Sequence, residues 1–219
     1  MFMSKIYISA RASRAMIEYL TDFGHQVCQV QPLPQLEQAI ADHPDLQLCS
    51  FGAGKPVFHG KTSRIGRGYP ADVPYNACCT GRYFIHNLKY TAPELLDAAK
   101  EEGLEPLHVP QGYARCSCLP VDETSIITAD RGISAACRKS GLTVLEITPG
   151  YVDLPGYSYG FIGGCAGRIG DTILFHGSLA DHPDGDAIRR FIEERGLICV
   201  DFPSFKLTDI GSIIEEKIL

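Results

Sequence analysis

The nine cysteines are the first side chains in this sequence to consider for nucleophilic or metal chemistry. They occur singly or in the short runs Cys78-Cys79 and Cys116-Ser117-Cys118. The sequence has no Cys-x-x-Cys pair, the usual ligand spacing of structural zinc, so we expect no metal site. Most of these thiols are expected to be reduced and buried, as is ordinary for a protein kept inside the cell. A reactive thiol needs surroundings that favour the thiolate, and the fold must supply them.

The elements that would position these side chains repeat along the chain. Three stretches each contain a β-branched or aromatic strand, a helix, a Gly-Leu pair and a second strand. A glycine directly after a helix is a typical C-cap, because the left-handed conformation costs glycine little. The stretches are residues 83–109, with a helix over 93–102, residues 126–147, with a helix near 134–139, and residues 173–200, with a helix over about 184–195.

A strand of small residues is predicted in front of each stretch, over 76–79, 115–118 and 161–165. Small residues suit a crowded location such as a narrow central axis.

The N-terminal residues form a fourth copy, with a strand over 5–9, a helix over 13–23 and an exit strand over 27–30. The small-residue strand of this copy is expected at the other end of the chain, over 209–214. Pairing of that segment with the first strand would close a ring and leave no free sheet edge. A fifth copy over 46–59 keeps two strands, but the residues after it have lost the helical pattern.

The recurrence of these elements in phase predicts an α/β protein built from about five copies of one unit. An ordinary doubly wound α/β chain is the alternative. A dinucleotide-binding version is disfavoured, because no Gly-x-Gly-x-x-Gly follows the first strand and no Walker loop is present.

Composition and charge disfavour several classes of protein. The 219 residues are 45% hydrophobic and 21% charged, which is the balance of a folded domain rather than a disordered chain. A net charge of −6 disfavours nucleic acid as a partner. No apolar run approaches the ~20 residues that span a bilayer, and the first residues lack a signal peptide. We therefore expect a cytoplasmic protein with a small-molecule partner and no membrane contact, and its oligomeric state stays open.

Five pseudo-repeats of a ββαβ unit with glycine-rich inner strands resemble the pentein fold, the α/β-propeller of the guanidine-modifying enzymes. Four motifs resemble, more narrowly, an uncharacterised bacterial branch of penteins: residues 43–48, 116–123, 159–164 and 209–213. The resemblance implies a single domain over residues 1–219, a five-fold pseudosymmetric α/β-propeller closed by its N- and C-terminal segments. The implied blades are 207–219 with 1–31, 43–74, 75–110, 113–149 and 159–203.

The resemblance also implies a nucleophile. In pentein enzymes a cysteine thiolate attacks the central carbon of a guanidinium, a histidine moves protons, and carboxylates hold the cation. The cysteine lies in a pattern similar to Arg-Cys-x-Ser-x-Pro. Residues 115–120 match this pattern except that Cys118 replaces the second small residue, so Cys116 is the implied nucleophile.

The remaining groups follow from the order of the blades. A His-x-Asp motif two blades before the nucleophile matches His43-Pro44-Asp45, and a carboxylate one blade further back matches Asp209. His43 would act as general acid and base, while Asp45 and Asp209 would orient the histidine and the substrate. Neither a metal nor an organic cofactor is implied.

Two features depart from the family pattern. Pro44 stands where a hydrophobic residue is usual, and Asp209 is a single carboxylate where the deiminases have a Glu-Gly-Gly-Asp signature. The second departure weakens the case for arginine itself as the substrate. Alternatives therefore stay open: Cys116 as a core thiol, His43-Pro44-Asp45 as a turn and helix cap, and Asp209 as a surface turn or cap.

Other residues are expected to line the substrate site or one end of the ring: Arg115, Asn76, Asp130, Lys89, Gly163 and Gly164. For Lys89 and Asp130 a solvated turn is the alternative. The equivalent histidines His86 and His176 are expected to be structural. Cys165 or Cys118 could replace Cys116 as the reactive thiol.

The sequence thus predicts a cysteine-dependent hydrolase or amidinotransferase that acts on a small guanidino or amidino compound through a covalent intermediate. The alternative is a non-catalytic binding protein of the same fold, which the single carboxylate and the truncated copy favour. A purely structural ring is a third reading, because a fold by itself does not imply an activity. The position of Cys116 relative to His43 discriminates between them.

Overall fold

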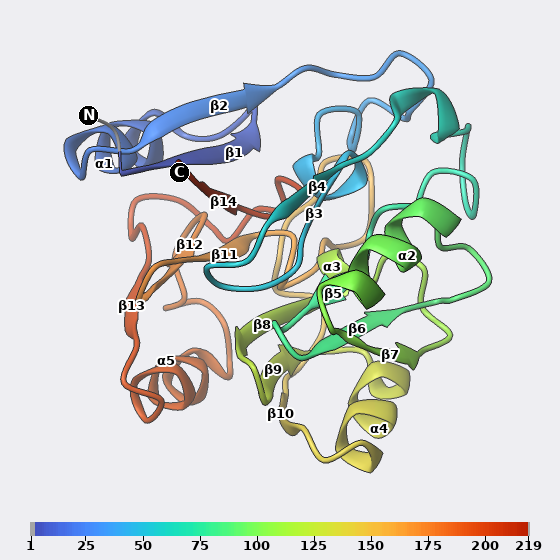
Figure 1. The fold of residues 1–219 in the computed structure, drawn as a ribbon. Helices are drawn as coiled ribbons and strands as arrows, with labels where there is room; N and C mark the ends of the chain where they lie inside the picture. The colour runs from blue at the N-terminus through green and yellow to red at the C-terminus, as the bar shows by residue number, and fades with distance from the viewer. Residues whose placement is uncertain (1–2, 219) are drawn as a thin grey trace.

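The structure of this protein is a computed structural model that describes residues 3–218. Within these residues five small β-sheets surround a common centre, and the longer helices lie at the periphery (Figure 1). Four of the sheets have three strands and one has two.

The three-stranded sheets share one topology. An inner strand pairs antiparallel with a middle strand, which pairs parallel with an outer strand after a helical crossover. In the order inner, middle, helix and outer, three of these units are β5 (Cys78–Cys79), β6 (Tyr83–His86), α2 (Pro93–Glu101) and β7 (Glu105–His108); β8 (Cys118–Asp122), β9 (Ser125–Thr128), α4 (Arg131–Lys139) and β10 (Thr143–Glu146); and β11 (Ala166–Ile169), β12 (Thr172–Phe175), α5 (Gly185–Glu193) and β13 (Ile198–Val200).

The fourth unit joins the two ends of the chain. Its elements are β14 (Ile214–Lys217), β1 (Ser4–Ser9), α1 (Arg14–Asp22) and β2 (Gln26–Val30). β14 runs antiparallel to β1, with Ile214 opposite Tyr7, and Figure 1 shows the two termini on the same side. This register confirms the predicted pairing of the C-terminal segment with the first strand.

The remaining sheet has two strands, β3 (Leu48–Ser50) and β4 (Val57–His59). As predicted, no α-helix follows it: residues 60–77 contain only the 3₁₀ turn η2 (Thr62–Arg64). A second 3₁₀ turn, η1 (Pro44–Leu46), precedes β3.

The outer helices form because each presents an apolar pair four residues apart, which lies on one helical face. These pairs are buried against the sheets, and they are Met16 and Leu20, Leu95 and Ala99, Ile133 and Cys137, and Ile188 and Ile192.

The inner strands contact one another at the centre. β3 contacts β5, β5 contacts β8, β8 contacts β11, β11 contacts β14, and β14 contacts β3. Glycine makes this approach possible: a Cβ on Gly167 would lie 1.9 Å from the Ile213 carbonyl oxygen, and one on Gly163 would lie 2.2 Å from that of Arg115. The small residues therefore mark a crowded axis, as the sequence indicated.

The limits of the predicted small-residue strands were wrong in three places. Residues 115–118 belong mostly to a helical turn, α3 (Ala114–Ser117), while β11 starts only at Ala166 and β14 only at Ile214. In the first case the reason is visible. The N–H groups of Arg115 and Cys116 donate to the side-chain oxygen of Asn76, so they are not available to a strand ladder.

One predicted helix also starts earlier than expected. α4 begins at Arg131, because the Asp130 carboxylate accepts a hydrogen bond from the N–H of Ile133 and caps the first turn.

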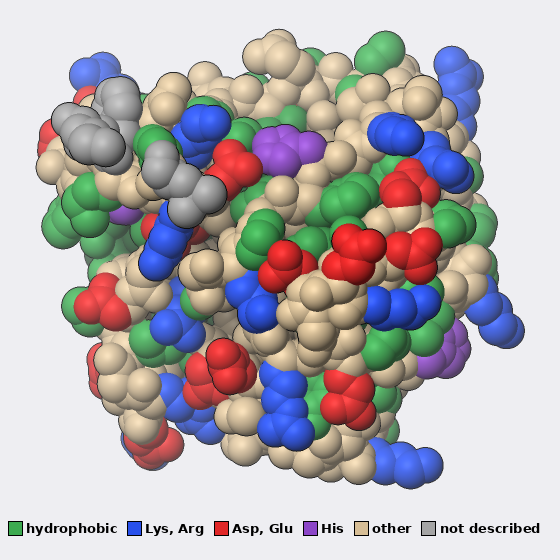
Figure 2. Space-filling view, viewed as in Figure 1, with side chains coloured by type: hydrophobic (Ala, Val, Ile, Leu, Met, Phe, Trp, Pro, Cys, Tyr) green, Lys and Arg blue, Asp and Glu red, His purple; other side chains and the backbone are tan. Residues whose placement is uncertain are grey.

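The surface carries both signs of charge. Figure 2 shows acidic and basic side chains interspersed over the face seen in Figure 1, without a broad patch of one sign. None of the helices in the described residues has the length and apolar character needed to cross a membrane.

The contact between β11 and the segment before β14 gives a stability prediction. Gly167→Ala should lower the free energy of unfolding by about 3 kcal/mol or more, because its methyl group meets a backbone carbonyl that cannot move without breaking the centre. Gly150→Ala is the control, since Gly150 has a φ of +99° and no atom within 4 Å of an added Cβ. Its cost should be about 1–2 kcal/mol from backbone strain alone. Equal losses in urea unfolding would contradict this account.

Candidate active site

The Cys116 thiol lies between a carboxylate and an amide. It is 3% exposed and sits in the helical turn α3. The thiol donates to Asp45 Oδ2 at 3.0 Å and accepts from Asn76 Nδ2 at 3.4 Å. Asp45 comes from η1 and Asn76 from the segment before β5, so three separate segments meet at the sulfur.

Asn76 fixes the backbone around this thiol. Its Oδ1 accepts from the N–H of Arg115 at 2.9 Å and from that of Cys116 at 3.3 Å. Its Nδ2 also donates to the Asp45 carbonyl oxygen at 3.2 Å. The sequence placed Asn76 among substrate-binding residues, whereas in the structure its amide holds the nucleophile candidate.

Ser212 is a residue of the site that the sequence reasoning missed. Its hydroxyl lies 2.5 Å from Asp45 Oδ2 and 3.0 Å from the Gly163 carbonyl oxygen, so it donates to one of the two. Ser212 has a φ of +74°, an uncommon conformation for a residue with a side chain. Its place beside Gly211 in the Asp-Ile-Gly-Ser-Ile motif was the available signal.

His43 and Asp209 face each other on the other side of the site. His43 Nδ1 is 3.9 Å from Asp209 Oδ1, which is too long for a hydrogen bond. The carboxylate of Asp209 instead accepts from the N–H groups of Phe161 and Gly211, at 2.9 and 3.0 Å. Asp209 therefore lies nearer the histidine, and Asp45 lies nearer the thiol.

Two glycines leave room for these side chains. A Cβ on Gly164 would lie 2.1 Å from Asp209 Oδ1, and a Cβ on Gly211 would lie 2.2 Å from His43 Cβ. Gly164 also accepts from Ser212 N–H and donates its own N–H to the Cys116 carbonyl oxygen. The predicted Gly163-Gly164 pair thus packs directly against the site.

The same groups have the composition of a partial metal site. One ligand atom each from His43, Asp45 and Cys116 lies within 4.8 Å of the others. Imidazole, carboxylate and thiolate are all ligands of Zn²⁺, and three protein ligands are the usual number in catalytic zinc sites. They are equally the nucleophile, base and carboxylate of thiol catalysis.

The electrostatics keep the thiol protonated. Burial, followed by the charges of Asp45 and Asp209, raises the pKa of Cys116 well above its ordinary value. Burial also raises the pKa of Asp209, although the nearby His43 acts in the opposite direction. A cation brought between these groups would reverse the effect and favour the thiolate.

The unpaired polar atoms of the protein interior gather around Cys116. Within the described residues, the buried side-chain nitrogen and oxygen atoms without a hydrogen-bond partner are both ring nitrogens of His43, Oδ1 of Asp45, Oδ1 of Asp72 and Oγ of Ser117. Buried polar atoms are nearly always paired in folded proteins, so a cluster of exceptions needs a functional explanation.

A cavity of about 380 Å³ lies beside this site. It is lined by Ser117, by Gly160 and Phe161 next to Asp209, and by Asp130, whose carboxylate also caps α4. Tyr151 and Tyr159 give the cavity an aromatic wall. Its size falls within the usual range of small-molecule sites.

Two other predicted residues lie elsewhere. The Arg115 guanidinium turns away from the thiol and donates to the carbonyl oxygens of Cys118, Gly163 and Ala166. Lys89 is an exposed residue in a turn, where its N–H donates to Asn87 Oδ1.

The remaining histidines and thiols behave as structural groups. His86 hydrogen-bonds Thr91 and the Gly112 carbonyl, and burial lowers its pKa to about 4. His176 accepts from the Ser13 N–H. Cys165 is fully buried, with its thiol directed at the Ile162 carbonyl oxygen.

Loops cover the thiol. Tyr113, directly before α3, donates its hydroxyl to Asp72 Oδ2 at 2.5 Å. Leu154 packs into the same core cluster as Leu36 and Ile40. Near it, the Tyr157 hydroxyl donates to the Glu37 carboxylate, a contact that raises the pKa of Tyr157 to about 12. The loop around residue 157 is therefore tied to the segment that leads into His43.

Comparison with known proteins gives a family and a fold. Residues 7–214 match the model of a family described as a family of unknown function, DUF6873. No protein of curated function matches the sequence.

Two solved structures share the fold. One is a histidine-to-glycine variant of dimethylarginine dimethylaminohydrolase as an adduct with S-methyl-L-thiocitrulline. It has a TM-score of 0.55 and 12% identity, with 93% of each chain covered. The other is an adduct of dimethylarginine dimethylaminohydrolase with 4-chloro-2-hydroxymethylpyridine, with a TM-score of 0.50, 10% identity and the same coverage. The mixed α/β structure therefore has the propeller-like fold of the pentein type, as the motifs predicted.

The charge of Asp45 gives a pH prediction. Because the neighbouring carboxylates raise the pKa of Cys116, Asp45→Asn should shift the pH profile of Cys116 alkylation by neutral iodoacetamide downward by about one to two pH units. Peptide mass mapping after timed labelling would measure it. Cys199, whose own pKa is raised to about 11 mainly by burial, is the internal control and should keep its profile. An unshifted Cys116 profile would show that the Asp45 charge does not act on the thiol.

The tie between the loops predicts how the thiol is reached. Tyr157→Phe removes the hydrogen bond to Glu37, so Cys116 should be alkylated about two- to fivefold faster at constant pH, since a part-exposed bond to a charged group contributes modestly. Tyr159→Phe, on the same exposed loop, should leave the rate unchanged. Identical rates in both variants would mean that the thiol is reached by another route.

Proposed function

We propose that this chain, which belongs to the DUF6873 family, is a cysteine-dependent enzyme that hydrolyses or transfers the amidino group of a small guanidino or amidino compound. The observation that carries this proposal is the set of unpaired buried atoms around Cys116. A planar cation with several N–H groups would give acceptor partners such as Asp45 Oδ1 the donors they lack.

The negative charge of the site supports a cationic substrate. Asp45 and Asp209 both act on the thiol, and among the groups named in its pKa shift no cation offsets them. A guanidinium or amidinium would neutralise the two carboxylates and lower the pKa of Cys116 at the same moment. The substrate would therefore complete the nucleophile, which would stay an inert thiol in its absence.

The reaction follows from these positions. The Cys116 sulfur bonds to the central carbon of the substrate and gives up its proton. His43 donates a proton to the departing nitrogen as the carbon–nitrogen bond breaks, and a thiouronium-type intermediate remains. Water then adds to the carbon and loses its proton to His43, and the carbon–sulfur bond breaks. Guanidinium and water thus give a urea and an ammonium ion, or the amidino group passes to an amine in place of water.

The other residues have positioning roles in this scheme. Asn76 holds the turn that carries Cys116, and Ser212 holds Asp45 Oδ2. The cavity beside Ser117 would take the part of the substrate that does not react. Similarity in fold to structures of dimethylarginine dimethylaminohydrolase, an enzyme named for a guanidino substrate, supports the same class of reaction.

The finer architecture belongs to this proposal too. The cyclic order of contacts from β3 through β14 and back supports a five-fold pseudosymmetric ring closed by the terminal segments. Such a ring places the start of every inner strand at one end of the axis, where residues 43–45, 76, 116 and 209 all lie.

A non-catalytic binding protein is the second candidate. The raised pKa of the buried Cys116 thiol favours it, and so does the arrangement of three metal-type ligands around the sulfur. This protein would hold a cation or metal ion at the same groups without bond making.

Two reagents of the same shape test the proposal: cationic 2-chloroacetamidine and neutral 2-chloroacetamide. Relative to the partly exposed Cys28, Cys116 should prefer the cation by about tenfold or more at pH 7, since two carboxylates attract it. Asp45→Asn and Asp209→Asn should each reduce this preference towards that of Cys28. Timed labelling with peptide mass mapping gives both rates in one sample.

Turnover separates the two candidates. A screen of guanidino compounds for urea-product release should show activity that Cys116→Ser abolishes and Cys165→Ser keeps. His43→Ala should stop turnover while Cys116 labelling continues. A Cys116 that shows the same reagent preference as Cys28 would refute the cation site, and preference without any turnover would favour the binding protein.

A further inference from the structure

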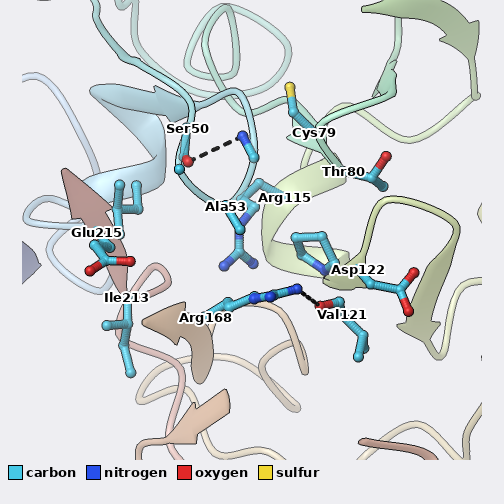
Figure 3. Close-up of a pocket in the computed structure, with 14 residues that line it drawn as sticks. Ser50, Ala53, Cys79, Thr80, Arg115, Val121, Asp122, Arg168, Ile213 and Glu215 are labelled. Carbon is cyan, nitrogen blue, oxygen red and sulfur yellow. Dashed lines mark hydrogen bonds between the residues drawn. The ribbon is translucent and has the colours of Figure 1, made fainter. Parts of the chain in front are cut away.

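A second cavity lies at the other ends of the inner strands, away from Cys116 (Figure 3). The candidate catalytic groups precede the inner strands in the chain, whereas this cavity is lined by residues in or just after them. It includes one contribution from each of the five sheets: Ser50 of β3, Cys79 of β5, Val121 of β8, Arg168 of β11 and Glu215 of β14. Because a strand rises about 3.3 Å per residue, the two places are separate.

Two guanidinium groups reach this cavity without a carboxylate partner. Arg115 is 7% exposed, and its Nη1 and Nη2 atoms donate only to backbone carbonyl oxygens, at 2.9–3.2 Å. Arg168 donates to the carbonyl oxygens of Val121 and Gly170, at 2.7 and 2.8 Å. Among the salt bridges of residues 3–218, neither arginine takes part. A buried cation without a counter-charge is costly, so an anion would complete the pair.

The acidic residues at the rim do not supply that charge. Asp122 accepts from the N–H and hydroxyl of Thr124 and lies 3.5 Å from Arg195. Glu215 accepts from the Gly170 N–H at 2.9 Å. Figure 3 shows their carboxylates directed to the two sides, away from the guanidinium groups in the middle.

The wall opposite Arg168 comes from the short loop of Gly52, Ala53 and Gly54. Gly52 is required there, because its φ is +134° and an added Cβ would lie 2.5 Å from the Gly81 backbone. A glycine-rich loop lets main-chain N–H groups approach a ligand closely. The cavity measures about 50 Å³, room for about three or four water molecules, so it fits one phosphate or carboxylate group and no nucleotide.

We infer that this cavity is a binding site for a small free oxyanion, held by the guanidinium forks of Arg115 and Arg168 and bordered by the 52–54 loop. Arginine is suited to this role, because its fixed N–H geometry matches the two oxygens of a phosphate or carboxylate. The site is independent of the reaction proposed for Cys116, since it has the opposite charge and uses the other ends of the strands.

Titration of the full-length protein with inorganic phosphate, sulfate and acetate, each against chloride at equal ionic strength, tests the inference. Isothermal titration calorimetry should show saturable binding of at least one oxyanion, and Arg168→Gln should weaken it tenfold or more. Arg14→Gln is the control, because Arg14 is an exposed arginine paired with Glu18, and it should bind like the unaltered protein.

Amide NMR shifts of the unaltered protein give a readout that needs no variant. The bound anion should shift the signals of Ala53 and Gly54, and the Asp209→Asn protein should show the same shifts. Binding that chloride matches at equal ionic strength, or that Arg168→Gln leaves unchanged, would overturn the inference. So would saturable binding without any shift in the 52–54 loop.

Discussion

Backbone meeting backbone at the central axis is the constraint on which the rest of this structure depends. The segments around Gly163, Gly164 and Gly167 approach their neighbours so closely that a single methyl group would overlap a carbonyl oxygen or a carboxylate. This closeness brings chain segments that are far apart in sequence within hydrogen-bonding distance. Asp45 and Ser212 are 167 residues apart, yet their side chains touch.

The crowding also determines the chemistry that the centre supports. A thiol, an imidazole and two carboxylates are packed where water has little access, so burial raises the pKa of both Cys116 and Asp209. Charged groups that are buried without partners are unfavourable, and a protein keeps them where a ligand supplies the missing charge. The interior thus sacrifices some stability at one end of the axis in favour of binding a cation.

The two ends of the axis are electrostatically opposite. Cys116 lies among carboxylates, while the next residue in the chain towards the N-terminus, Arg115, sends its guanidinium to the cavity at the far ends of the strands. Adjacent residues of one helical turn therefore serve two environments. The carbonyl oxygens of Cys118, Gly163 and Ala166 hold the arginine between them.

Local pattern determined the elements and part of the site. Apolar pairs four residues apart predicted the outer helices, β-branched runs predicted the middle and outer strands, and the lost helical pattern after residue 59 was correct, because these signals depend on near neighbours in the chain. The motifs singled out Cys116, His43, Asp45 and Asp209, and the structure places all four together. Only the tertiary structure decided their partners. That Asn76 would cap the turn of Cys116, that Ser212 would meet Asp45, and that Arg115 would turn away all depend on contacts between distant segments. Spacing along the chain carries no signal for such contacts, because packing at the axis alone brings those segments together.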